Sequence, residues 1–346
     1  MGISRLCYNR TVDMLKDGTI KANWLTLKGT IIKGLPTFGS DAPYQVRSIA
    51  VKDACDAVRR AKLAYKATGK FHQVKFRAKK SPKQSLYLPK SAVRNGSIFV
   101  SILGKTLKSS EPIPEAKYDG RVVYEYGSWW IVLPVDTTTE IPKTKERVVS
   151  LDPGIRNFMT YYSQDSTGFI ATNGWRKLLS YCHEIDKIIS KESKATSSKK
   201  QNLKRAEKRL RRRVKFLRDE LHWKTSVWLC KTYETIVLPA LPAVELSKRT
   251  KRKITSKSVR ALLTLSHGQF LQRLKYAAMK YGSSVVVVSE AYTSKTCTVC
   301  GHVHENLGGA KTFRCPNCGT KVSRDINGAR NILLRAMVDK PAWKQA

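Results

Sequence analysis

Acidic residues are scarce in this chain of 346 residues, which has 26 Asp and Glu against 65 Lys and Arg. The formal net charge of +39 repels itself in a compact state unless a polyanion neutralises it, and this favours nucleic acid as a partner. An anionic membrane is the competing polyanion. However, no apolar run approaches the roughly 18 residues of a transmembrane helix, and the N-terminal MGISRLCYNR lacks a signal-peptide apolar stretch. Charge alone does not separate an enzyme from a ribosomal or histone-like protein.

Cysteines with disulfide-like spacing are also lacking, which excludes a disulfide framework and indicates a reducing compartment. Four of the eight cysteines form two knuckles, Cys297-x2-Cys300 and Cys315-x2-Cys318, and the other four are scattered. Two such knuckles can place four thiolates around one Zn²⁺ ion and close its coordination shell. The sequence therefore predicts a structural zinc ribbon. Its metal has to stabilise it, because a segment this short cannot form a hydrophobic core of its own.

Hydrophobic periodicity predicts a helix over 43–70. Region 71–136 then holds short β-rich runs, typical of a small antiparallel barrel, at 71–76, 85–89, 97–102, 122–126 and 128–135. A polar linker follows at 137–146. The remaining chain alternates between strands and helices. The apolar run 283–290 predicts a strand buried on both faces. The other expected elements are a strand at 147–153, a hairpin at 158–172, helices at 176–233 and 259–281, a strand at 235–240 and a final helix at 325–337.

Three carboxylates stand at the ends of predicted elements: Asp152 and Glu290 end strands, and Asp325 begins the last helix. Converging carboxylates repel unless they share cations, and their hard oxygens suit Mg²⁺. Two such ions would activate water and stabilise the leaving oxygen of a phosphodiester. Each residue also has a plain structural alternative, as a turn residue (Asp152), a solvated strand end (Glu290) or a helix N-cap (Asp325). Spacing alone leaves these alternatives open.

Basic residues concentrate in 191–215, where twelve Lys and Arg face two Glu. We expect this helix to track the backbone of an RNA–DNA duplex, and a solvated surface helix is the alternative. The basic segment 248–253 is either a further phosphate contact or a nuclear localisation signal. Trp129 and Trp130 either stack on bases or place one ring in the core. The candidate phosphate contacts are Lys204, Arg205, Lys208, Arg209, Arg211, Arg212, Arg213, Lys248 and Arg249.

The runs VSLDPGIRNFMTYY, SEAYTSKTCTVCG and FRCPNCGTKVSRDINGARNILLRA resemble the C-terminal half of TnpB/OrfB transposon proteins and their Fanzor relatives. They are also similar to the nuclease half of type V CRISPR effectors. The resemblance covers about 147–337 and implies an α/β multi-domain protein, with an RNase H-like (RuvC) mixed sheet and an inserted zinc ribbon. The implied domains are a helical recognition-lobe-like region (1–70), a wedge β-barrel with linker (71–146), a RuvC core (147–294) with a basic helical insertion (176–233), the zinc ribbon (295–322) and a C-terminal helix and tail (323–346).

The resemblance further implies an RNA-guided, metal-dependent DNA endonuclease encoded by a transposon-type element. Pairing with a guide RNA reads double-stranded target DNA, and the protein reads a short flanking motif. The implied cofactors are structural Zn²⁺ and catalytic Mg²⁺. An intracellular location is expected, the nucleus for a eukaryotic or viral host and the cytoplasm or nucleoid for a prokaryotic one. The oligomeric state is left open.

One departure concerns the acids. By resemblance Asp152 is the first RuvC acid and Asp325 the third, but Ala240 stands where the family carries the second. Either the protein is a nuclease-inactive, RNA-guided transcriptional regulator, or the acid has moved to Glu290 on the next strand, roughly 4.8 Å away. Relocation is favoured, and Glu245 is a weaker substitute. A generic basic RNA-binding ribbon protein is the third class considered.

Overall fold

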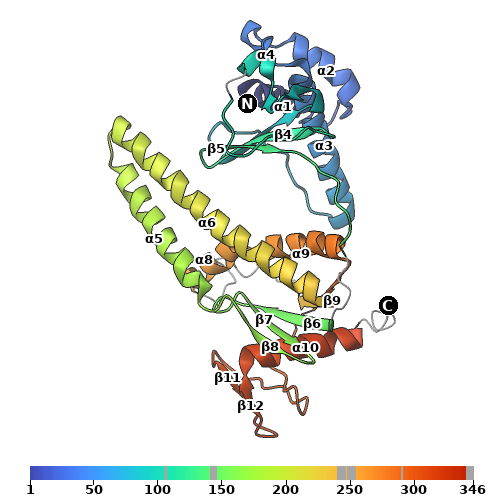
Figure 1. The fold of residues 1–346 in the computed structure, drawn as a ribbon, viewed down its shortest axis with the longest axis vertical. Helices are drawn as coiled ribbons and strands as arrows, with labels where there is room; N and C mark the ends of the chain where they lie inside the picture. Colours follow the sequence, from blue (N-terminus) through green and yellow to red (C-terminus); the bar gives the residue numbers. More distant parts are fainter. Residues whose placement is uncertain (105–106, 141–145, 240–246, 248–254, 290, 340–346) are drawn as a thin grey trace. The chain divides into compact units, whose positions relative to one another are not determined.

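The structure, a computed structural model, describes residues 1–104, 107–140, 146–239, 247, 255–289 and 291–339. The chain divides into two compact units, Met1–Asp136 and Thr137–Ala346. Figure 1 shows the elements of each unit along the chain. No helix among the described residues is long and apolar enough to cross a membrane.

Three helices form the first part of the N-terminal unit: α1 (Gly2–Met14), α2 (Trp24–Lys33) and α3 (Tyr44–Thr68). The predicted helix over 43–70 is confirmed, and it ends at Gly69 in the left-handed conformation that glycine adopts without strain. A 3₁₀ turn, η1 (Thr37–Gly39), lies between α2 and α3. The helices bury an apolar core that includes Cys7, Leu15, Leu27, Ile31, Ala50, Val51 and Cys55.

The strands of this unit form a three-stranded antiparallel sheet in the order β1-β4-β5 and a separate hairpin β2-β3. Among the described residues, 71–76 is not a strand, and Phe71 and Phe76 are exposed with no neighbouring strand to pack against. The strand expected at 97–102 stops at Ile98, because Phe99 adopts a left-handed conformation and starts helix α4. A closed barrel stays a prediction. The bounds are β1 (Lys83–Leu88), η2 (Lys90–Ala92), β2 (Val93–Arg94), β3 (Ser97–Ile98), α4 (Val100–Leu103), β4 (Gly120–Glu125) and β5 (Ser128–Val132).

A five-stranded mixed sheet forms the centre of the second unit, in the order β10-β9-β6-β7-β8. The strands β6, β9 and β10 run parallel, so their carboxyl ends meet at one edge, while β6, β7 and β8 form antiparallel hairpins. The predicted hairpin at 158–172 is confirmed. The bounds are β6 (Glu146–Pro153), β7 (Met159–Ser163), β8 (Thr167–Ile170), β9 (Tyr233–Pro239) and β10 (Ser284–Val288).

Helices cover both faces of this sheet (Figure 1). One face packs against α5 (Gly174–Ser193), α6 (Ser197–Thr232), α8 (Ser256–Leu265) and α9 (His267–Tyr281), and the other against α10 (Arg324–Asp339). This three-layer arrangement buries the apolar residues of the parallel strands on both sides. On the α10 face, Val237 and Val288 pack against Ile332 and Ala336.

One expectation for this unit was wrong in detail. The helix predicted over 259–281 is two helices, because Ser266 adopts a left-handed conformation with φ 53° and breaks the helix. The strand predicted at 283–290 is β10, which has cores on both faces: Val285 and Val287 pack against one, and Val286 and Val288 against the other. The burial is partial, since β10 is an edge strand among the described residues and only Val288 is fully buried.

Two histidines are buried in the larger core, where their rings sandwich Phe158. The ring centroids of His222 and His267 lie 5.2 and 5.1 Å from that of Phe158, at interplanar angles of 19° and 10°. Burial lowers the pKa of each histidine to about 4, only partly offset by the backbone at Leu265 and Gly154. Both rings are therefore neutral in the folded protein near pH 7.

We expect the second unit to lose stability as the pH falls from about 6.5 to about 4, because the unfolded chain binds protons on His222 and His267 that the folded chain excludes. The two histidines do not lower the free energy of unfolding above pH 6.5. By pH 4 each of them lowers it by about 3 kcal/mol. Denaturant titrations at pH 7 and 4.5 measure the loss. His267→Phe should remove about half of it, while His183→Phe on the exposed side of α5 should not. An unchanged pH dependence in His267→Phe would contradict this assignment.

Candidate functional site

Asp152 lies at the carboxyl end of β6, in register with Thr160 of β7. It shares a sheet face with Ser150, whose hydroxyl donates to the carbonyl oxygen of Ala329 on α10 at 2.7 Å. The carboxylate of Asp152 rests against the same helix, because a Cβ atom added to Gly328 would lie only 2.8 Å from Asp152 Oδ2. Gly328 therefore provides the space that this carboxylate occupies.

Asp325 lies in the first turn of α10, three residues before Gly328, so both positions are on one side of the helix. Asn157, in the turn between β6 and β7, donates from Nδ2 to Asp325 Oδ2 at 3.3 Å. The fold thus brings Asp152 and Asp325 to one end of the sheet, and both carboxyls are half-buried. The third predicted acid, Glu290, lies outside the described residues, as do Ala240 and Glu245.

Sequence reasoning missed Gly328 and Asn157 as part of this site. The signals were present, since Asn157 follows the Asp-Pro-Gly turn and Gly328 is a glycine inside a predicted helix, where it costs stability unless packing requires it.

We expect Gly328→Ala to displace the carboxylate of Asp152 or shift α10, because the new methyl group meets Asp152 Oδ2 inside van der Waals contact. The cost should be roughly 1–3 kcal/mol, as for other overpacked sites. Thermal unfolding measures it. Gly268→Ala is the matched control, since this glycine of α9 has nothing within 4 Å of the added atom and should be neutral or slightly stabilising. Equal melting temperatures for the two variants would contradict the close contact.

The four clustered cysteines converge on one point. Their Sγ atoms all lie within 4.8 Å of one another, with 3.7 Å between Cys297 and Cys318 and 3.5 Å between Cys300 and Cys315. Sulfurs around a tetrahedral zinc with bonds of about 2.3 Å are about 3.8 Å apart. The residues therefore fit a zinc ion, and this four-cysteine cluster is the one group of three or more metal-type ligands found among the described residues.

The local chain conformation favours metal binding at these knuckles. Gly301 and Gly319 follow them with φ of 74° and 71°, the left-handed turn that glycine permits. The Thr320 hydroxyl lies 3.0 Å from Cys318 Sγ, within hydrogen-bond reach of that sulfur. The strands β11 (Thr312–Arg314) and β12 (Lys321–Ser323) complete the ribbon, whose small core is Cys297, Leu307, Phe313 and Cys315.

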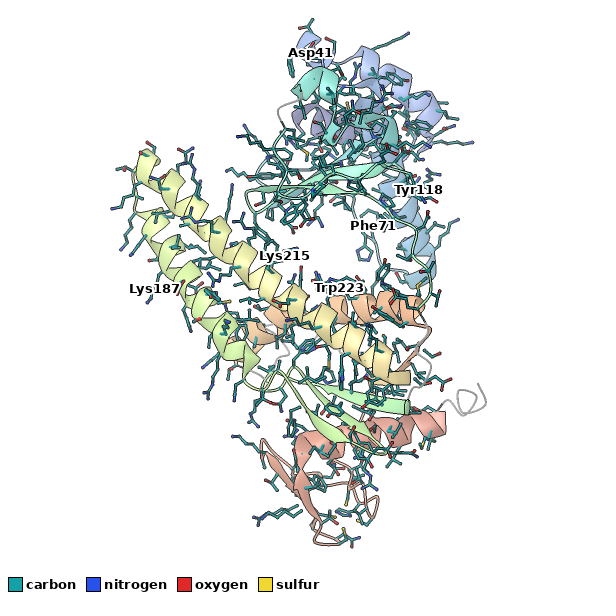
Figure 2. All side chains as sticks on the ribbon, in the orientation of Figure 1. Asp41, Phe71, Tyr118, Lys187, Lys215 and Trp223 are labelled. Atoms are coloured by element: carbon teal, nitrogen blue, oxygen red, sulfur yellow. The ribbon has the colours of Figure 1, made fainter. Side chains whose placement is uncertain are left out.

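The predicted basic helix is α6, which pairs with α5 as a helical hairpin (Figure 1). Figure 2 shows side chains along both helices, with Lys187 on α5 and Lys215 on α6 labelled. Several of the candidate cations have local partners. Lys204 pairs with Glu192 at 3.5 Å, Arg211 pairs with Glu207 at 2.6 Å, and Arg213 stacks on the Tyr181 ring at 5.2 Å.

The other candidates on α6 follow one another along the helix surface. Arg205, Lys208 and Arg209 are exposed, and Arg212 is half-buried. Lys248 and Arg249 lie outside the described residues. The excess of cations over carboxylates on this helix leaves a basic surface that suits phosphates.

Aromatic and basic groups are also exposed in the N-terminal unit. Trp129 and Trp130 are 61% and 43% exposed on the edge strand β5, so neither ring is in the core. Trp129 packs on Tyr124, with 5.0 Å between ring centroids. Both indoles are therefore accessible for stacking.

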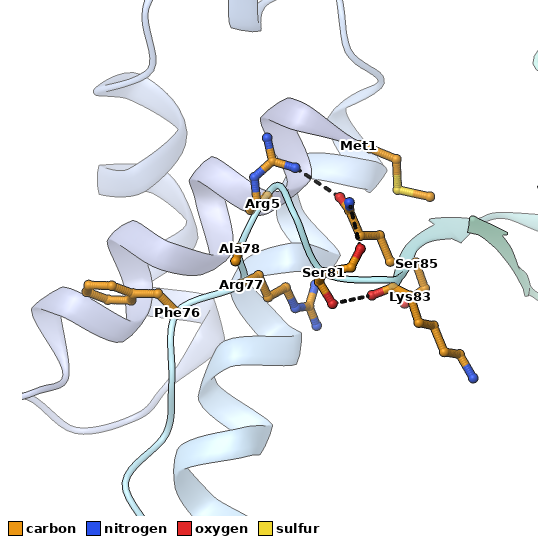
Figure 3. Close-up of a pocket in the computed structure, with 9 residues that line it drawn as sticks. Met1, Arg5, Phe76, Arg77, Ala78, Ser81, Lys83 and Ser85 are labelled. Carbon is orange, nitrogen blue, oxygen red and sulfur yellow. Dashed lines mark hydrogen bonds between the residues drawn. The ribbon is translucent and has the colours of Figure 1, made fainter. Parts of the chain in front are cut away.

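A pocket of about 450 Å³ lies between α1 and the start of β1 (Figure 3). The described residues lining it include Arg5, Arg77 and Lys83 and no carboxylate. Arg5 donates to Gln84 Oε1 at 2.9 Å, which fixes the amide at the pocket wall. Arg77 pairs with Asp53 at 3.3 Å, so Arg5 and Lys83 are the pocket cations that suit an anionic group such as a phosphate.

Two family models match the chain. The model OrfB_IS605, described as a probable transposase, matches residues 131–250, and the model of the Cas12f1-like TNB domain matches residues 267–332. Together they cover the central sheet, the basic hairpin, the cysteine cluster and the first half of α10.

Individual relatives point the same way. TnpB-like protein L770 of Acanthamoeba polyphaga mimivirus is 32% identical over 72% of this chain and 49% of its own length, so the chain spans about half of that relative. InsQ of Escherichia coli K12, whose name describes it provisionally as an RNA-guided DNA endonuclease, is 27% identical over 69% of this chain and 62% of its own.

The fold agrees with a solved structure. The Cas12f1 chain in a complex with sgRNA and target DNA superimposes with a TM-score of 0.54 over 95% of this chain and 80% of that one, at 13% identity. The chain thus has a Cas12f/TnpB-like α/β fold with a mixed sheet and a cysteine cluster, and at this identity the likeness concerns the fold alone. By its family models, its relatives and its fold, the chain belongs to the TnpB/OrfB family.

Proposed function

We propose that this protein is an RNA-guided, metal-dependent DNA endonuclease of a transposable element, with an RNase H-like (RuvC) nuclease site. The observation that carries the proposal is the carboxylate pair at the sheet edge. Asp152 of β6 lies against Gly328 of α10, and Asp325 of the same helix accepts a hydrogen bond from Asn157, so both half-buried acids are at the same end of the sheet. Acidic residues are scarce in this chain, so two carboxylates at one end of the sheet, one at the carboxyl end of β6 and one in the first turn of α10, indicate a cation site.

The residues at this edge fit Mg²⁺, which prefers carboxylate oxygens and binds through one or two of them plus substrate phosphate. When bound, such ions activate water and stabilise the leaving oxygen of a phosphodiester. We assign Asp152 and Asp325 as ligands, and Glu290 as the third. The support for Glu290 is its position in the sequence, two residues after Val288, which packs on the α10 face of the sheet.

We further propose that the four cysteines hold a structural Zn²⁺, and that a guide RNA and double-stranded target DNA contact the basic surface of α6, the pocket of Figure 3 and the exposed indoles of β5. Pairing between guide and target would read sequence, and the N-terminal unit would serve as recognition lobe and wedge that reads the flanking motif. The support is a formal charge of +39, which needs a polyanion for a compact assembly.

The test begins by purifying the protein with the RNA it carries and sequencing that RNA. The complex is then incubated with DNA that matches the guide part of this RNA and that has a randomised sequence beside the match. Cleavage in Mg²⁺ that stops in a chelator, and that requires the match, supports the proposal. Tight matched binding without cleavage in Mg²⁺ or Mn²⁺ would instead favour a nuclease-inactive regulator, which Ala240 keeps as the second candidate.

We expect Arg205→Gln with Arg209→Gln to weaken DNA binding by about tenfold or more and to reduce the slope of log K against log salt by up to about 2, since each lost phosphate contact contributes about 0.9. Both side chains are exposed on one side of α6, four residues apart. Titration of the RNA–protein complex with duplex DNA at several salt concentrations measures both quantities. Lys224→Gln is the control, because Lys224 on the same helix pairs with Glu220 at 2.7 Å. Equal slopes for all three proteins would contradict a role of this surface.

A further inference from the structure

Two asparagines on the sheet-facing helix α10 contact the loop that leads into the first cysteine knuckle. Asn327 and Asn331 lie four residues apart and are 1% and 7% exposed. Asn331 donates from Nδ2 to the carbonyl oxygens of Thr293 at 2.8 Å and Thr296 at 2.7 Å. Asn327 donates from Nδ2 to Thr296 O at 2.7 Å and accepts from the backbone N–H of Thr298 at 3.2 Å.

These hydrogen bonds hold the backbone on both sides of Cys297, one of the four clustered cysteines. Thr296 and Thr298 are the two neighbours of Cys297, and Asn327 bonds the backbone of both. Cys297 is itself buried, and its Sγ lies 3.7 Å from that of Cys318. The backbone of Cys297 is also held within the ribbon, where its N–H donates to His302 O at 2.8 Å, but an amide that belongs to α10 holds the residues on both sides of it.

The same helical turn holds the carboxylate pair. Asn327 stands between Asp325, which accepts from Asn157, and Gly328, which contacts Asp152. Asn327 is two residues from Asp325 and one from Gly328, and residues one or two apart on a helix point in different directions, so one turn of α10 bonds the ribbon on one side and holds the acids on the other. A displacement of this turn alters both.

The second end of the ribbon reaches the helix directly. β12 ends at Ser323 and α10 begins at Arg324, whose backbone N–H donates to Lys311 O at 2.9 Å and whose guanidinium donates to Gly308 O at 2.8 Å. A metal at the four cysteines joins the two knuckles. The metal therefore links the first knuckle, whose loop is bonded by the two asparagines of α10, to the second knuckle, whose chain continues through β12 into α10.

We propose that Asn327 and Asn331 are positioning residues that couple metal binding at the four cysteines to the placement of the α10 turn carrying Asp325 and Gly328. The metal at the cysteines then stabilises the carboxylate pair without contacting it. Because binding free energies are linked, the helix must stabilise the metal site by the same factor as the metal stabilises the helix.

The first test measures zinc release from the purified full-length protein to a chromogenic chelator. Asn327→Ala and Asn331→Ala should each release zinc faster and bind it roughly ten- to a hundredfold more weakly, as expected when a partner that orients a metal ligand is removed. Asn331→Asp is a second variant, since it keeps the side-chain shape but loses the donor to both carbonyl oxygens. Zinc release within twofold of the natural chain in all three variants would overturn the proposal.

The second test separates coupling from a general loss of stability. Amide hydrogen exchange of the peptide covering the start of α10 is followed with zinc bound and after chelation. In the natural chain we expect chelation to accelerate exchange there by about the same ten- to hundredfold factor. In Asn327→Ala, the start of α10 should exchange at nearly the same rate with and without zinc.

Asn317→Ala is the matched control, because Asn317 donates to Cys300 Sγ at 3.6 Å from within the ribbon. It should weaken zinc binding while α10 stays sensitive to chelation. An α10 that responds to chelation equally in Asn327→Ala and in the natural chain would also overturn the proposal. Neither readout needs nucleic acid or cleavage, so failure of the proposed nuclease function would leave this test intact.

Discussion

Asp152→Asn should reduce target cleavage on the order of a thousandfold or more, while the protein still binds its RNA and the matched DNA. Asparagine keeps the shape that fits against Gly328 but removes the negative charge that a divalent cation needs. Asp325→Asn should have a similar effect, and the two together should cost little more than either alone, because residues that act as one unit are not additive. Cleavage and binding of the same labelled target separate the two activities.

Asp165→Asn is the control for this prediction, since Asp165 is an exposed aspartate in the β7–β8 turn of the same sheet. It should cut at the rate of the natural chain. If Asp152→Asn retains cleavage within tenfold of the natural chain, the carboxylate pair has no part in the chemistry. Glu290→Ala tests the third acid in the same assay, and loss of cleavage there would support relocation from the position of Ala240.

Cys315→Ser should remove the metal and unfold the ribbon. Cys315 is buried in a core of only a few apolar residues, so metal binding and not packing has to stabilise this segment. Structural zinc contributes roughly 10–16 kcal/mol of apparent binding free energy, and loss of one of four thiolates removes most of it. Metal content by mass spectrometry should fall from one zinc per chain to near zero, and protease should cleave within 297–323.

Cys182→Ser is the matched control, because Cys182 is a buried cysteine of α5 that lies outside the cluster. It should keep one zinc per chain and cost only the packing of a small apolar side chain. A Cys315→Ser protein that still holds one zinc would show that three thiolates suffice, and the ribbon would then be stabilised in another way.

Local patterns predicted most elements of the second unit because each pattern reports on its own segment. The long helices, the β7–β8 hairpin and the two knuckles depend on periodicity, turn residues and spacing within a short stretch of chain. The errors arose where neighbours decide. Among the described residues, 71–76 pairs with no strand, and β10 is an edge strand whose valines are partly buried apart from Val288. Whether a strand lies at the edge or the centre of a sheet depends on its neighbouring strands, and a run of valines gives no information about them.

The amino-acid sequence by itself determined the chemistry that is available: a closed set of four thiolates, a helix with a large excess of cations, and a few carboxylates at the ends of strands and helices. Only the tertiary structure decided which of these meet. Val237 and Val288 dock α10 through Ile332 and Ala336, and this packing brings Gly328 against Asp152 and the asparagines of α10 against the cysteine loop. The physical reason is that such contacts join residues up to 179 positions apart, as Ser150 and Ala329 are, and no local pattern records them.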